Sequence, residues 1–157
     1  MNMTPVFGKL NLKNQKQIVV LQAPESFEPE IEALEGVEVI RDIKKTPTLV
    51  FSLTFVTKQQ EVDSLAPLIA KKAEGDAVVW FAYPKGSSKK YKSGINRDSG
   101  WSALGREGFE PVRMIAIDED WSAVRFRRIN FIKNMKRGSE HLLTERAKQP
   151  VPKAPKR

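Results

Sequence analysis

Residues 77–83 read AVVWFAY and residues 49–56 read LVFSLTFV, two runs in which nearly every side chain is apolar. Runs of this length, rich in aromatic and β-branched residues, predict strands covered on both faces, as in the centre of a parallel sheet. A third run, QIVVLQ at residues 17–22, predicts another buried strand. These three segments decide the fold class.

Helical patterns separate the predicted strands. An apolar stripe over residues 57–74 predicts a helix, which Pro67 should kink or divide into two segments. Ser26 is placed to cap a shorter helix that runs to Leu34. The more polar residues 37–43 predict a strand near the edge of the sheet.

The second half of the chain predicts a hairpin. Residues 112–117 and 123–129 have strand character, and the acidic stretch at residues 118–121 reads as their connection. A short helix, capped by Asn96 or Ser99, precedes the hairpin.

The order of these elements predicts an α/β fold with one mostly parallel sheet, helices on both faces and a C-terminal antiparallel hairpin. We place this α/β domain at residues 1–128 and a basic helical extension at residues 129–149. The Pro- and Lys-rich residues 150–157 predict a disordered tail.

The positive charge is concentrated in the second half of the sequence. The 157 residues carry a net charge of +8, divided as −2 over residues 1–84, +4 over residues 85–128 and +6 over residues 129–157. Five cations lie in one stretch that holds no acid before Asp98: Lys85, Lys89, Lys90, Lys92 and Arg97. Such asymmetry indicates an anionic partner, or a tail that keeps the protein in solution.

A candidate site follows from the predicted topology, because open α/β sheets bind ligands at the carboxyl ends of their parallel strands. Residues 22–26, 84–92 and 118–121 should meet there. The candidates for binding an anion or ligand are Lys85, Lys89, Lys90, Tyr91, Lys92, Arg97 and Ser26, with Asp118 and Asp120 as acids at the same edge. The simpler alternative is a cluster of exposed ion pairs, with Ser26 acting only as a helix cap.

Several stretches resemble a bacterial family of small proteins, the domain-of-unknown-function family 3052. They are VVLQAPESFEPEI, VTKQQE, AVVWFAYPK and AIDEDWSAVRFR, spread over residues 7–128. The resemblance implies a shortened Rossmann-type, methyltransferase-like sheet, and it implies no particular activity.

Signals of catalysis are few. The chain has no cysteine and a single histidine, His141, which argues against thiolate catalysis and histidine-rich metal sites. A methyltransferase would place a glycine-rich turn after its first strand, where this chain has residues 22–26 (QAPES), although Asp42 could hold a ribose. We therefore expect no cofactor, no metal and no catalytic residue.

The favoured function is a non-catalytic binding domain whose basic loop holds nucleic acid or another phosphate-bearing partner, with Tyr91 available for stacking. One alternative is a divergent enzyme related to S-adenosylmethionine-dependent methyltransferases. Another is a protein–protein interaction module that uses the basic C-terminal extension. Because the sequence shows neither a signal peptide nor an apolar run near the ~20 residues of a membrane span, we expect a cytoplasmic protein without a membrane partner.

Overall fold

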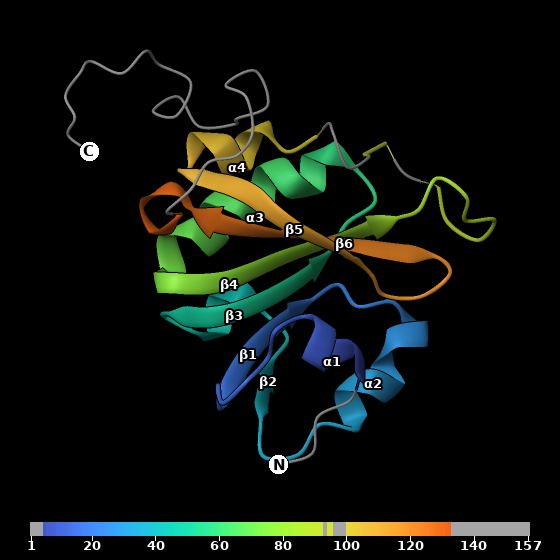
Figure 1. Ribbon diagram of the computed structural model, residues 1–157, viewed down its shortest axis with the longest axis horizontal. Helices are drawn as coiled ribbons and strands as arrows, with labels where there is room; N and C mark the ends of the chain where they lie inside the picture. Colours follow the sequence, from blue (N-terminus) through green and yellow to red (C-terminus); the bar gives the residue numbers. More distant parts are fainter. Residues whose placement is uncertain (1–4, 93, 96–99, 133–157) are drawn as a thin grey trace.

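The computed structural model describes residues 5–92, 94–95 and 100–132. Six strands form one sheet in the order β2-β1-β3-β4-β6-β5 (Figure 1). The strands are β1 (Gln17–Leu21), β2 (Glu38–Ile40), β3 (Leu49–Phe55), β4 (Ala73–Pro84), β5 (Phe109–Ala116) and β6 (Trp121–Arg128). The helices are α1 (Pro5–Lys9), α2 (Glu28–Glu32), α3 (Gln59–Lys72) and α4 (Ser102–Arg106), with 3₁₀ turns η1 (Glu25–Phe27), η2 (Ile43–Lys45) and η3 (Ile129–Phe131).

The sheet is mixed. Strands β2, β1, β3 and β4 pair in parallel, whereas β6 pairs antiparallel with both β4 and β5. The chain passes from β1 outward to β2 and then returns to β3 on the other side of β1. This reversal creates a topological switch point between the carboxyl ends of β1 and β3. The predicted fold class is confirmed, including the antiparallel hairpin at the end of the sheet.

Two apolar clusters, one on each face, explain why the central strands are apolar throughout. Along β4, Val79 and Phe81 face α3 and α4, whereas Val78 and Trp80 face α1 and α2. The alternation follows from the two-residue period of a strand. All four side chains are almost completely buried, so the strand has no face on which polar residues would be tolerated.

The first segment of the chain closes one face of the sheet. Phe7 of α1 is fully buried in the cluster beneath α1 and α2. The Trp80 indole nitrogen donates a 2.7 Å hydrogen bond to the Leu10 carbonyl, which fastens this segment across β4. The sequence analysis did not predict α1, because five residues are too few to show a helical period.

The helix cap predicted at Ser26 is wrong, and so is one of the two outcomes expected of Pro67, the division of its helix. Ser26 does not cap a helix, since it lies within η1, and the N-cap of that turn is Pro24. The amide of Phe27 donates to the Pro24 carbonyl at 2.9 Å, so a tight turn precedes the short helix α2. Pro67 starts no second segment, because α3 continues through it as one helix of 14 residues. Pro67 is exposed on α3, where water can hydrogen-bond to the carbonyl that its missing amide leaves unpaired.

Most of the predicted C-terminal organisation lies outside the described residues. Within them, η3 follows β6 directly, and the remainder of the 129–149 extension and the 150–157 tail are not covered. Asn96 and Ser99, the predicted caps of the short helix, also lie outside, and α4 occupies the predicted position of that helix.

Candidate functional site

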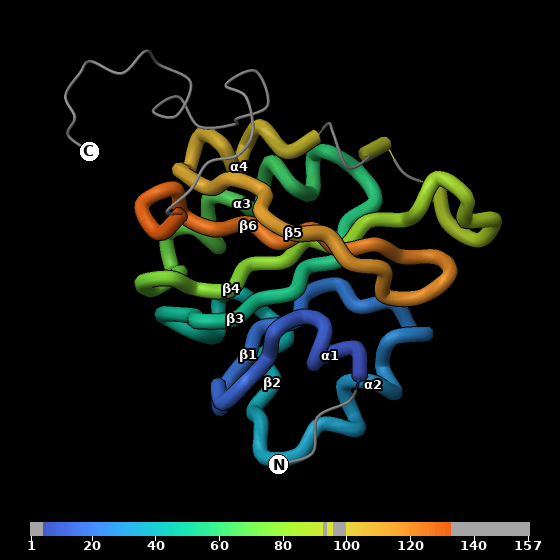
Figure 2. Tube along the Cα trace, in the orientation of Figure 1, coloured from blue at the N-terminus to red at the C-terminus, as the bar shows by residue number. Residues whose placement is uncertain are grey.

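Three chain segments meet at the carboxyl edge of the sheet. Strand β5 runs in the same direction as β1, β3 and β4, because it is antiparallel to β6 and β6 is antiparallel to β4. The segments that follow β1, β4 and β5 therefore lie at one edge. Figure 2 shows the segment after β4 beside the turn between β5 and β6. We call residues 85–92 the lysine loop.

Hydrogen bonds fix the backbone of the lysine loop to the β5–β6 turn. The amide of Lys85 donates to the Asp120 carbonyl at 2.8 Å, and the Ser88 hydroxyl donates to the Asp120 carboxylate at 2.9 Å. The Ser88 oxygen also accepts from the amides of Lys90 and Tyr91, at 3.2 and 3.1 Å. Ser88, which the sequence analysis did not single out, is thus the centre of the loop's hydrogen bonding.

The acids at this edge stabilise the turn. Asp118 Oδ1 accepts hydrogen bonds from the amides of Asp120 and Trp121 at 2.8 and 2.9 Å. This is the pattern by which an aspartate side chain closes a tight turn. Asp118 and Asp120 therefore hold backbone and hydroxyl donors, and neither forms an ion pair with a lysine of the loop within the described ranges.

The lysine ammonium groups of the loop are left without carboxylate partners. Lys85 is half-buried, and the other three side chains, Lys89, Lys90 and Lys92, are exposed. None of the four forms an ion pair within the part of the chain that the structure describes. The Lys90 ammonium lies 5.7 Å from the centre of the Tyr91 ring, within the range of a cation–π contact. The loop thus presents four positive charges on a backbone that its neighbours hold in place.

The Tyr91 ring packs against the core. Its centre lies 5.0 Å from that of Trp121, which in turn lies 5.1 Å from Phe55. Tyr91 is half-buried, so part of one ring surface is already covered by the domain. The residue therefore anchors the loop, and only its remaining exposed surface is available for a ligand.

Of the two remaining candidate residues, the structure describes Ser26. Ser26 is exposed in η1, after β1, and its side chain makes no hydrogen bond among the described residues. Arg97 lies outside the described residues.

Gln22, the first residue of the 22–26 segment that the sequence analysis places at this edge, spans the topological switch point. Its backbone adopts φ = +59°, a left-handed conformation that side-chain-bearing residues rarely take. Its side-chain amide donates a 2.7 Å hydrogen bond to the carbonyl of Phe55, the last residue of β3. Thus a side chain, rather than a glycine, connects the ends of β1 and β3.

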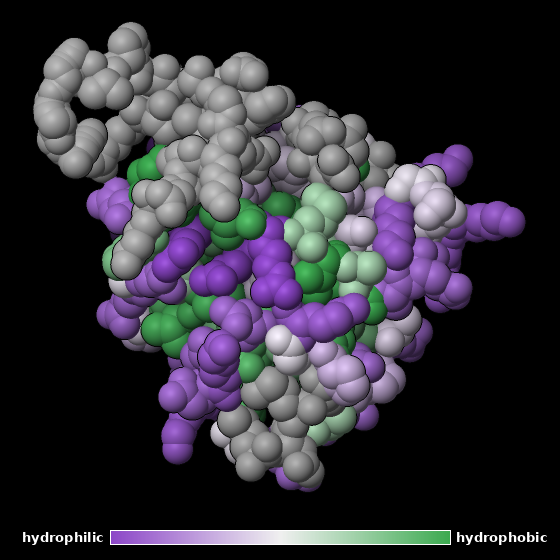
Figure 3. All heavy atoms as spheres, viewed as in Figure 1, coloured by the Kyte–Doolittle hydropathy of each residue, from purple (hydrophilic) through white to green (hydrophobic). Residues whose placement is uncertain are grey.

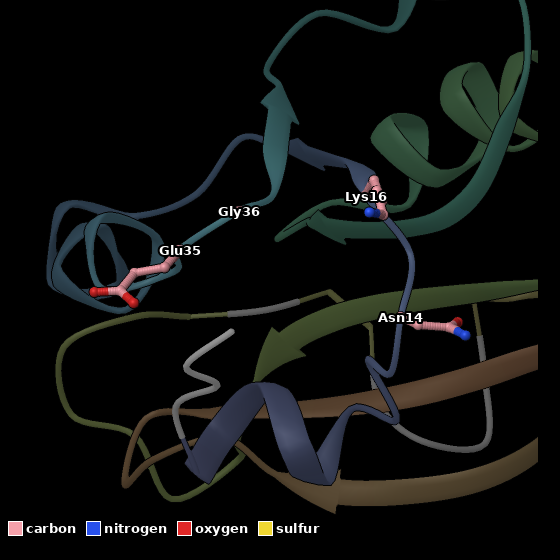
Figure 4. A pocket seen from close by; sticks show the side chains of 4 residues that line it. All are labelled: Asn14, Lys16, Glu35 and Gly36. Carbon is pink, nitrogen blue, oxygen red and sulfur yellow. The ribbon is translucent and has the colours of Figure 1, made fainter.

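A shallow depression lies at the opposite, amino edge of the sheet (Figure 4). Its volume is about 380 Å³, and Asn14, Lys16, Glu35 and Gly36 line it. The Glu35 carboxylate and the Asn14 amide point away from Lys16 and from each other. Since a binding pocket brings polar groups together around its ligand, this depression is a weaker candidate than the carboxyl edge.

The described residues show no cluster of metal ligands and no membrane-spanning helix. They contain no group of three histidine, aspartate or glutamate side chains placed to hold a metal ion. In the same ranges, every helix is too short or too polar to span a bilayer.

The comparisons with known proteins define the class of fold. The chain resembles an S-adenosylmethionine-dependent methyltransferase from Aquifex aeolicus, with a TM-score of 0.52 and 14% identity over 79% of this chain and 88% of that one. It also resembles magnesium protoporphyrin IX methyltransferase from Synechocystis, with a TM-score of 0.50 and 10% identity over 78% and 74%. The domain therefore has a methyltransferase-like Rossmann fold.

Another similar structure is a possible exported protein from Bordetella parapertussis, with a TM-score of 0.55 and 10% identity. The similarity covers 78% of this chain but only 65% of that protein's length. No family model matches the chain, and no curated protein does. The resemblance to domain-of-unknown-function family 3052 therefore stays a prediction, and these likenesses concern the fold alone.

Proposed function

We propose that this protein is a non-catalytic domain that binds an anionic partner, and that the lysine loop carries the contact. The observation behind the proposal is that, within the described residues, the four ammonium groups form no ion pair although Asp118 and Asp120 lie at the same edge. Those carboxylates accept hydrogen bonds from backbone amides and Ser88 instead.

The fixed loop backbone favours binding. A loop that is already held in one conformation loses less conformational entropy when a partner binds. Lysine ammonium groups act as point charges, without the bidentate geometry by which arginine reads bases. The partner class that fits is therefore a polyanion recognised through its phosphates, such as a nucleic acid.

The switch point supports the non-catalytic part of the proposal. In a nucleotide-binding Rossmann fold, the turn after the first strand needs glycine so that the backbone can approach the cofactor. Here that turn begins with Gln22, whose side chain is hydrogen-bonded to Phe55, and Pro24 has no amide to donate. The residues after β1 do not fit S-adenosylmethionine in the manner of this fold, so we assign no methyl transfer.

Binding to a fluorescent single-stranded oligonucleotide at about 50 mM salt tests the proposal. Reversal of Lys85, Lys89, Lys90 and Lys92 to glutamate should abolish the binding. The matched control reverses four exposed lysines near the opposite edge, Lys13, Lys16, Lys44 and Lys45, and should retain most of it. Equal losses in the two variants, or no binding by the native chain, would contradict the proposal.

A divergent methyltransferase is the second candidate, because the fold resembles those of the two methyltransferases named above. It would have to hold the cofactor with an altered pocket near residues 22–26 and Lys85. Thermal denaturation with excess S-adenosylmethionine tests it: at 100 times its Kd, a ligand stabilises by roughly 2.7 kcal/mol. An unchanged melting temperature at millimolar cofactor would exclude this candidate.

A further inference from the structure

A second basic feature lies on the sheet itself, away from the lysine loop. Arg125 and Arg127 of β6 follow Trp121 and Ala123 at two-residue spacing, so they point to the same face of the sheet. On β5, Arg113 is in direct register with Arg125. Three guanidinium groups are thus brought together on the face that α1 and α2 cover elsewhere.

Among the described residues, the cluster beneath α1 and α2 does not extend over this part of the face. The apolar cluster beneath α1 and α2 contains only Trp121 and Ala123 among the buried residues of β6. Beyond them, Arg125 and Arg127 are half-buried and Arg113 is exposed. Figure 3 shows hydrophilic side chains gathered over β5 and β6 near the middle of the molecule.

Within the described residues, Arg127 is the member of the arginine cluster that pairs directly with a carboxylate. Asp76 accepts two hydrogen bonds from Arg127, at 2.8 and 2.6 Å. The buried Glu110 is also in register with Arg127. By contrast, Arg113 and Arg125 form no ion pair or hydrogen bond within the described ranges.

The arrangement of Arg113 and Arg125 is unfavourable in the absence of an anion. Like charges directly opposite each other on neighbouring strands destabilise a sheet. In addition, the Nε atom of Arg125 is buried without a hydrogen-bond partner among the described residues, which costs free energy. Burial first, and then the neighbouring Arg127, lower the pKa of Arg125; Asp76 opposes this shift in part, and Arg113 adds to it.

We propose that Arg113 and Arg125 form a binding site for a phosphate group on this face of β5 and β6. Planar guanidinium groups match the oxygens of a phosphate in paired hydrogen bonds, and two opposed groups can share one phosphate between them. The phosphate belongs either to a small phosphate-bearing ligand or to a nucleic-acid backbone. This site is separate from the lysine loop, and it does not depend on the function proposed above.

Nuclear magnetic resonance of the arginine Nε–Hε groups tests the site directly. The full chain is titrated with inorganic phosphate, and chloride keeps the ionic strength constant. We expect saturable shifts at Arg113 and Arg125 and none at Arg106, an exposed arginine of α4. A second titration uses a single-stranded oligothymidylate. Saturation by phosphate indicates a small ligand, whereas saturation by the oligonucleotide alone indicates a nucleic-acid backbone.

Variants complete the test. Arg113→Gln changes an exposed side chain, so the fold should be preserved. Because it removes one charge-assisted hydrogen bond, it should raise the Kd for the probe that binds about tenfold. Arg106→Gln is the matched control and should leave the Kd unchanged. Reversal of the four loop lysines should not alter the phosphate-induced shifts of Arg113 and Arg125. The proposal is overturned if neither probe gives a saturable shift, if Arg106 responds equally, or if Arg113→Gln binds as the native chain does.

Discussion

The hydroxyl of Ser88 donates a 2.9 Å hydrogen bond to the carboxylate of Asp120, and this contact joins the lysine loop to the β5–β6 turn. The same oxygen accepts from the amides of Lys90 and Tyr91. A neutral side chain thus connects the loop to the nearby acid, while the lysines form no ion pair with the residues that the structure describes. The loop is held by hydrogen bonds, and its charge is left available for a partner.

Ser88→Ala should loosen the lysine loop without unfolding the domain. The substitution removes the acceptor of two amides and the donor to Asp120, so we expect hydrogen exchange at Lys90 and Tyr91 to accelerate by about tenfold, equivalent to ~1.4 kcal/mol of lost protection. Ser88→Thr keeps the hydroxyl and should exchange as the native chain does. Unchanged exchange at both amides in the alanine variant would show that Ser88 does not hold the loop.

Two substitutions of Gln22 should distinguish the effect of backbone strain on stability from the effect of the hydrogen bond to Phe55. Gln22→Ala keeps the φ of +59° and loses the bond to Phe55, so it should reduce the free energy of unfolding by about 1 kcal/mol. Gln22→Gly loses the same bond but relieves the left-handed strain, and it should be about 1 kcal/mol more stable than the alanine variant. Urea denaturation measures both, and an alanine variant as stable as the glycine variant would contradict this account.

Trp80→Phe should destabilise the fold although it replaces one aromatic residue by another. The change leaves the Leu10 carbonyl without the indole donor and opens a void in a fully buried position. We expect a loss of about 1–3 kcal/mol in the free energy of unfolding. The native indole proton should also be among the slowest to exchange with solvent. A loss smaller than about 0.5 kcal/mol, the usual range for surface substitutions, would mean that this contact does not fasten the first segment.

Asp76→Asn should have opposite effects on stability and on anion binding. The side chains of Asp76 and Arg127 are each about one-third exposed. Loss of this ion pair should therefore lower the free energy of unfolding by no more than ~1 kcal/mol. Because the substitution removes the negative charge nearest the arginine cluster, phosphate should bind Arg113 and Arg125 more tightly than before. Thermal denaturation and phosphate titration measure the two effects. Weaker phosphate binding in this variant would indicate that Asp76 positions the arginines for the ligand.

The strands were predictable because their signal is local. Each residue from 77 to 83 is buried. The apolar run that predicts β4 therefore reflects the central position of this strand in the sheet. The direction of the connections then followed from the helices between strands, which require parallel pairing. This placed the lysine loop and the acidic turn at one edge without any further information.

The sequence-based predictions for single side chains were wrong where they depended on tertiary contacts. Ser26 has the right chemistry for a helix cap, but Pro24 and Pro29 surround it and favour a tight turn followed by a short helix. The alternative of an ion-pair cluster at this edge depended on similar contacts. Asp118 and Asp120 accept hydrogen bonds from amides and a hydroxyl rather than from lysines. Hydrogen bonds of this kind depend on loop geometry, which composition and spacing do not determine.

The salt dependence of oligonucleotide binding tests the central claim most directly. If four lysines of the loop contact phosphates of a single strand, the slope of log K against log salt should be about −3 between about 50 and 200 mM salt. Reversal of the four lysines should remove most of that slope, and reversal of Lys13, Lys16, Lys44 and Lys45 should leave it nearly intact. A native chain that does not bind at low salt, or a slope that is the same in both variants, would contradict a function of the lysine loop in binding.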